Sequence, residues 1–200
     1  MSPPRYARTV PRPWEDTVGA HRAAVRDATL DAAAALIGER GPASVTMSHL
    51  AQRAGIGRAT LYKHFPDVDA VVTALHQRQI TRHLAELSEA RGRGGTAAQR
   101  LEAVLRAWAR IVRGSRSHHG SELVALLHRG PQVHEAQRQL HDLVRDLVAE
   151  GVAAGELRDD VAPEELATFA LHALTAAAGL RSPEAVDRLV ALTLDGMAGA

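Results

Sequence analysis

A short segment from Ile56 to Phe65, IGRATLYKHF, brings together side chains that could contact a polyanion. If it is helical, each residue turns by about 100°, so Leu61 and Phe65 point to one side. The other polar or small side chains point outward or lie on the flanks: Ala59, Thr60, Tyr62, Lys63 and His64. Hydroxyl, ammonium and imidazole groups can bind phosphate oxygens and base edges. The pattern predicts a helix held by two apolar residues, with a polar face free to meet nucleic acid.

Two earlier elements would position this helix. Apolar residues at helical spacing predict a first helix over residues 18–40, which stops before Gly41. Thr46 is a favourable N-cap for a second helix, and Gly55 is a favourable residue to end it. Two short helices joined by a glycine-containing turn predict a helix-turn-helix over residues 46–65. The second helix of such a motif fits the major groove of DNA.

Helical spacing continues to the C-terminus, and no strand pattern is present. The sequence predicts an all-α protein of about nine helices. The later ones are expected at 67–91, 97–113, 121–129, 133–154, 164–180 and 183–198. The predicted parts of the chain are a flexible basic arm (1–17), a three-helix DNA-binding domain with a helix-turn-helix (18–66) and a further helical domain (67–200).

The composition narrows the class of protein. The 200 residues include no cysteine, which excludes disulfides and thiolate metal sites. The longest apolar window, 166–180, is shorter than the roughly 20 residues of a membrane span, and the N-terminus lacks the apolar stretch of a secretion signal. We therefore expect a cytoplasmic protein. Residues 1–65 carry nine Lys or Arg against five Asp or Glu, a mild indication of a polyanionic partner.

The segment TMSHLAQRAGIGRATLYKHF, with the helix before it and PDVDAVVTAL after it, resembles the DNA-binding domain of the TetR (tetracycline-repressor-like) family. The shared features are Thr46, Leu50-Ala51, Ala54-Gly55 and the run 60–65. The resemblance covers roughly residues 20–75 and implies an operator of double-stranded DNA as partner. The positions that it implies to contact DNA are Thr46, Ser48, Gly57, Arg58, Ala59, Thr60, Tyr62, Lys63 and His64. Among them, residues 58–60 would read bases, whereas Tyr62, Lys63 and His64 would bind phosphates.

The resemblance also implies that residues 67–200 form a regulatory and dimerisation domain, in which the helices after the fourth bind a small-molecule effector and form a homodimer. The last two helices, about 164–198, would pair across a twofold axis. The small residues of ATFALHALTAAAG and the apolar residues of VDRLVALTLDGM favour such a four-helix bundle, although a core within one subunit is an alternative. Candidate residues for the effector pocket are Trp108, Arg110, His128, Phe169 and His172, and simple core packing is the alternative for Trp108.

The sequence thus predicts a transcriptional regulator that is released from a palindromic operator by a small molecule, most simply a repressor. A transcriptional activator of the same fold and a helical protein-interaction adaptor are the alternatives. No nucleophile elbow, phosphate loop or cofactor fingerprint is present, so neither an enzyme nor a cofactor is expected. His134 and His141 are seven residues apart, but no further ligand set accompanies them, and no metal site is predicted.

Overall fold

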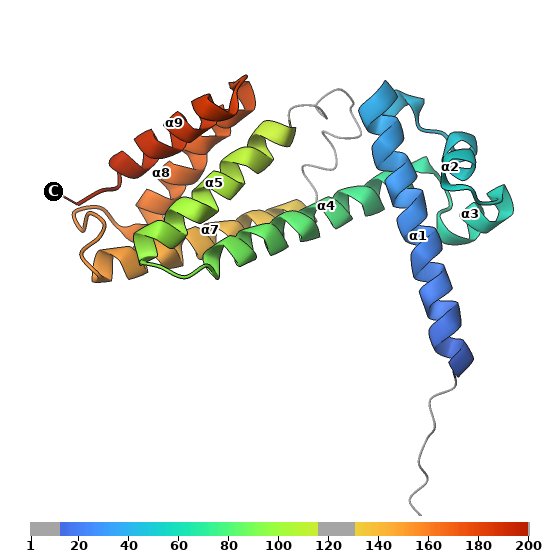
Figure 1. Cartoon of the computed structure of the whole chain (residues 1–200), viewed down its shortest axis with the longest axis horizontal. Coiled ribbons are helices and arrows are strands. Elements are labelled where there is room, and N and C mark those ends of the chain that lie inside the picture. The colour runs from blue at the N-terminus through green and yellow to red at the C-terminus, as the bar shows by residue number, and fades with distance from the viewer. Residues whose placement is uncertain (1–12, 116–130, 200) are drawn as a thin grey trace, which may run out of the picture.

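Helices make up most of the computed structural model, which describes residues 13–115 and 131–199 of the chain. Their bounds, shown in Figure 1, are α1 Pro13–Arg40, α2 Met47–Ala54, α3 Arg58–His64, α4 Val68–Arg91, α5 Ala97–Ser115, α7 Pro131–Ala153, α8 Pro163–Thr175 and α9 Pro183–Asp195. Two 3-10 helices, Pro42–Ser44 and Ala176–Gly179, accompany them. The predicted all-α class is confirmed. The helix expected at 121–129 lies outside the described residues.

Helix α1 begins at Pro13, five residues before the predicted start, so the expected arm of residues 1–17 is too long. Proline suits the first turn of a helix because it lacks only an N–H that would have no partner there. This short-range effect outweighs the lack of apolar periodicity before Val18. Residues 1–12 lie outside the described part of the chain.

The first helices form a small unit around one apolar cluster, which we call the head cluster. Its buried members come from α1, α2, α3, the first part of α4 and the connections between them: Leu30, Ala32, Ala33, Leu36, Val45, Met47, Leu50, Ala51, Leu61, Phe65, Val71 and Leu75. Three polar contacts add to this packing across α1. The Arg53 guanidinium of α2 binds both carboxylate oxygens of Glu39, at 2.5 and 3.1 Å, and it lowers the pKa of that carboxyl below its ordinary value. The Arg26 guanidinium of α1 also lies over the Phe65 ring at the end of α3, and Asp31 of α1 pairs with Arg78 of α4.

The turn between α2 and α3 depends on Gly55. Its φ of 67° lies in the left-handed region, and the N–H of Ile56 donates to the carbonyl of Ala51 at 3.0 Å, which closes α2. At the other end, Thr46 Oγ1 accepts from the backbone N–H of His49 at 3.1 Å. The predicted bounds of α2 are confirmed, because both signals are local.

Gly55→Ala is expected to lower the free energy of unfolding by about 1–2 kcal/mol, the cost of a left-handed backbone for a residue with a Cβ. Gly38→Ala is the matched control. Gly38 lies in α1, and an added Cβ would have no neighbouring atom within 4 Å, so a gain of about 0.5 kcal/mol is expected. Urea denaturation of both variants measures the difference. Changes of the same sign would contradict this description of the turn.

Helix α4 joins the head to the rest of the molecule. Val71 and Leu75 near its start belong to the head cluster, whereas Leu87 and Ala90 near its end belong to a second cluster. Arg78, between them, reaches back to α1 and contacts Asp31 at 2.8 Å and Asp27 at 3.9 Å. In Figure 1 the green α4 extends from beneath the blue α1 to the bundle of later helices. A change in the direction of α4 would therefore move α1 with it.

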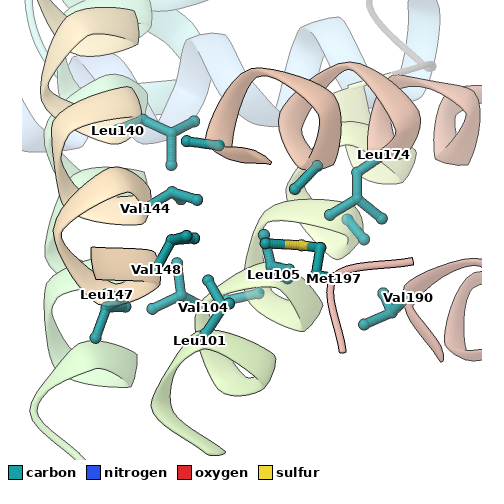
Figure 2. Close-up of a cluster of buried hydrophobic side chains, with 14 of the residues drawn as sticks. Leu101, Val104, Leu105, Leu140, Val144, Leu147, Val148, Leu174, Val190 and Met197 are labelled. Carbon is teal, nitrogen blue, oxygen red and sulfur yellow. The ribbon is translucent and has the colours of Figure 1, made fainter. Parts of the chain in front are cut away.

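The second cluster, which we call the body cluster, lies among α4, α5, α7, α8 and α9. Figure 2 shows Leu101, Val104 and Leu105 of α5 facing the side chains of α7. Met197, after α9, is fully buried in this cluster, and its carbonyl accepts from the N–H of Arg158 at 3.1 Å. An isolated bridge between Leu157 and Ala198 accompanies this contact, and the described residues form no strand. The C-terminal segment is thus held against the end of the bundle.

The two C-terminal helices are shorter than predicted. Helix α8 ends at Thr175 and passes into the 3-10 turn Ala176–Gly179, and α9 ends at Asp195.

Among the described helices, none combines the length and the apolar character needed to cross a bilayer.

Candidate nucleic-acid interface and cavity

Helix α3 is held on the head by its buried side. The side chains of Leu61 and Phe65 are 0% and 2% exposed, as the sequence pattern predicted. The Arg26 guanidinium of α1 lies 4.9 Å from the centre of the Phe65 ring, a cation–π distance. Helix α3 is only seven residues long. Because an isolated helix of that length is unstable, these contacts maintain its conformation and orientation.

The opposite side of α3 faces solvent. Tyr62 is 54% exposed, although a large aromatic side chain usually lies at least partly inside a protein. Four of the other predicted DNA contacts on α3 and its N-cap are also exposed: Gly57, Arg58, Ala59 and Lys63. The remaining two, Thr60 and His64, are half-buried. Gly57 is the N-cap of α3 and supplies no side-chain capping bond. The structure thus collects all of these predicted positions on one short helix and its N-cap.

Two further predicted positions lie on α2 or just before it. Thr46 is exposed, and its hydroxyl oxygen already accepts the capping hydrogen bond from His49. The hydroxyl hydrogen remains available to donate to an acceptor such as a phosphate oxygen. Ser48 is half-buried in the first turn of α2. Arg53, the basic residue of the last turn, is bound to Glu39 and does not add a free cation to this surface.

A cavity of about 250 Å³ lies where the head meets the body. Its walls come from four helices, with Ala34 and Ile37 on α1, Leu75 on α4, Trp108 on α5 and further residues on α7. Three polar side chains of α4 also line it: His76, Gln79 and His83. Sequence reasoning missed these three. Their spacing of three and four residues, which places them on one face of a predicted helix, could have indicated them.

Of the five residues predicted for the effector pocket, the structure places only Trp108 at this cavity. Arg110 is exposed on α5 and bonds back to the Arg106 carbonyl. Phe169 and His172 are exposed on α8, and none of these three residues lines this cavity. A helix with apolar residues on several sides does not reveal which side faces the interior. His128 lies outside the described residues.

The histidines of α7 do not gather a ligand set in the described part of the chain. His141 accepts from or donates to Thr168 Oγ1 at 3.1 Å, and its other ring nitrogen lies 3.7 Å from Glu164. Within residues 13–115 and 131–199, no three His, Asp or Glu side chains are placed to hold a metal ion.

Two family models match the chain. The model of bacterial regulatory proteins of the tetR family matches residues 30–75, which include the whole helix-turn-helix. The model of the C-terminal domain of SbtR-like transcriptional regulators matches residues 102–199. Together they cover most of the sequence. The chain belongs to the TetR family. It is therefore a transcriptional regulator of the helix-turn-helix class and not an enzyme, as the sequence predicted.

Comparisons with individual proteins agree with the family assignment. An uncharacterised HTH-type transcriptional regulator of Mycobacterium tuberculosis is 45% identical over 56 residues, which make up 28% of this chain and 28% of that protein. The match thus spans less than a third of the relative's length.

Solved structures share the fold. A TetR/AcrR-family regulator of Thermobifida fusca superposes with a TM-score of 0.72 at 22% identity, over 86% of this chain and 97% of that one. AibR, solved with isovaleryl coenzyme A and operator DNA, superposes with a TM-score of 0.60 at 17% identity, over 86% of this chain and 97% of that one. At sequence identities of 22% and 17%, these similarities show a shared fold only.

Proposed function

We propose that this TetR-family chain is a homodimeric repressor of the bacterial cytoplasm, which binds a near-palindromic operator and leaves it when a small molecule binds. The observation that carries the proposal is the two-sided character of α3. Leu61 and Phe65 are buried while Tyr62 and Lys63 are exposed. A short helix held rigidly from behind, with polar tips in front, suits insertion into the major groove.

The residues on the exposed face of α3 are suited to two kinds of DNA contact, to base edges and to phosphates. Arg58, Ala59 and Thr60, at the N-terminal end, read base edges, and arginine can donate two hydrogen bonds to guanine. Tyr62, Lys63 and His64, with Thr46 and Ser48 of the preceding helix, bind the phosphates on either side. Contacts of the second kind fix the position of the head and make affinity depend on salt, but they do not select a sequence.

The outer side of α8 and α9 supports the homodimer. Phe169 on α8 is 47% exposed and Leu192 on α9 is 69% exposed; with Tyr62, they are the large apolar side chains that the described residues leave most open to solvent. Two such residues on adjacent helices fit a face that a second copy covers. Paired helices of this kind would hold the two heads at a fixed separation. Recognition helices then enter successive major grooves about 34–36 Å apart.

The two clusters support a division into two domains, near the predicted 18–66 and 67–200. Helix α1 begins earlier, at Pro13, and Val71 and Leu75 at the start of α4 pack into the head cluster. The cavity lies at their junction, since Ala34 and Ile37 of α1 pack against the head cluster while Leu87 and Leu140 belong to the body cluster. A ligand there touches both units and can favour one relative orientation. To convert a 1:99 population of conformers into 99:1, it must bind one of them better by about 5.5 kcal/mol.

Selection of bound sequences from random duplex DNA tests the proposal. The selected sequences should contain an inverted repeat whose half-site centres lie about 10 base pairs, or a multiple of that, apart. A reporter gene placed behind the selected site then gives the sign of regulation. Lower expression in the presence of the protein supports a repressor, and higher expression would show an activator instead. Failure to enrich any sequence, together with stable binding to another protein, would favour the adaptor alternative.

A further inference from the structure

The cavity between head and body has a lining with a consistent chemical character. Most of it is aliphatic: Ala34, Ile37, Val72, Leu75, Ile80, Leu84, Leu87, Ile111, Val133, Ala136 and Leu140. Its polar side chains are all uncharged groups or imidazoles: His76, Gln79, His83, Ser115 and Gln137. Such a surface gains most from a ligand that is mainly apolar, with few groups that need hydrogen bonds.

Fixed charge is missing from this lining. No Lys, Arg, Asp or Glu is among the described residues that form it. Burial, with the nearby Arg82 acting in the same direction, lowers the pKa of His83 below its ordinary value, so its imidazole is neutral at neutral pH. A charged ligand would lose its hydration here and gain no fixed counter-charge from the described lining, which is unfavourable.

Trp108 adds aromatic surface to this lining. Its side chain lines the cavity on α5, whereas its indole Nε1 is buried and has no hydrogen-bond partner among the described residues. Because that nitrogen presents no surface to the cavity, a ligand there meets the carbon atoms of the ring.

We propose that the effector of this regulator is an uncharged, largely aliphatic molecule. The inference rests on the proposed function, since it names the chemistry of the ligand that acts there. It separates this chain from AibR, whose solved ligand, isovaleryl coenzyme A, carries phosphates. The described lining of the present cavity has no cation to pair with such groups.

Displacement of an uncharged fluorescent probe, N-phenyl-1-naphthylamine, tests the chemistry of the cavity without DNA. The competitors are decan-2-one and decanoate, which have similar chains but differ in charge. We expect decan-2-one to displace the probe at a concentration at least tenfold lower than decanoate at pH 8. Equal or stronger displacement by decanoate would overturn the proposal, and this comparison needs no variant.

Operator binding is measured separately on the same protein. If wild-type protein binds selected DNA but prefers decanoate, the ligand class is wrong and the proposed function stands. If it binds no DNA, the proposed function fails, whatever the displacement shows. Release of the operator by decan-2-one, and not by decanoate, would support both.

Discussion

Lys63→Ala is expected to weaken operator binding by about a hundredfold. Lys63 is exposed on α3, and under the proposed function its ammonium group binds a phosphate. A charge-assisted hydrogen bond contributes about 1.5 kcal/mol, and a symmetric dimer loses two of them, hence about 3 kcal/mol. The logarithm of affinity should also depend less steeply on the logarithm of salt concentration, with a slope reduced by about 2. Fluorescence anisotropy from 50 to 300 mM salt measures both quantities.

Arg93→Ala is the matched control for charge. Arg93 is exposed in the connection between α4 and α5, which Figure 1 places at the end of the molecule far from α3. Its loss should leave the affinity and the salt slope nearly unchanged. Both substitutions are at the surface, so unfolding free energies should stay within about 0.5 kcal/mol of the wild-type value. If the two variants behave alike on DNA, the polar face of α3 is not the DNA-contacting surface.

Phe169→Glu is expected to give a monomer and to lower operator affinity by at least a hundredfold. The ring is 47% exposed in one chain, and burying a carboxylate in its place at a dimer interface is strongly unfavourable. A dimer binds its second half-site as an intramolecular event, which raises affinity by about 10²–10⁴-fold, and the monomer loses this gain. Light scattering after gel filtration gives the mass, and anisotropy gives the affinity.

Thr81→Glu serves as its control, since Thr81 is exposed on α4, outside the two C-terminal helices. This variant should remain a dimer and keep its affinity. The Phe169→Glu protein should still bind an isolated half-site as weakly as one head of the wild type does. A Phe169→Glu protein that remains a dimer with full affinity would place the twofold interface elsewhere.

The sequence predicts the head well because its signals are short-range. Thr46 and Gly55 each act on the few residues beside them, so the ends of α2 could be located without any knowledge of tertiary structure. The burial of Leu61 and Phe65 follows from helical periodicity alone, because α3 has one apolar side. Because α3 has only this one apolar side, it can pack against the head only with Leu61 and Phe65 facing inward.

The cavity could not be predicted in the same way. Its walls combine α1, α4, α5 and α7, and only their packing determines which sides of the helices surround a space. Phe169 and His172 were expected there because they are an aromatic and a polar residue in an apolar helix, yet α8 turns them to solvent. The spacing of His76, Gln79 and His83 places them on one side of α4, but polar residues also occur on its other sides. The sequence alone therefore does not show that this side faces the cavity.

Chemical labelling of Lys63 tests the central claim most directly, because it is the only lysine among the 200 residues. An amine-reactive acetylating reagent, applied briefly and followed by mass spectrometry, reports the exposure of this one side chain. The N-terminal amine is the internal reference. If α3 enters the groove, saturating amounts of the selected duplex should strongly slow labelling of Lys63, whereas a scrambled duplex at the same salt should not. Equal labelling rates in free protein and in the operator complex would contradict the account.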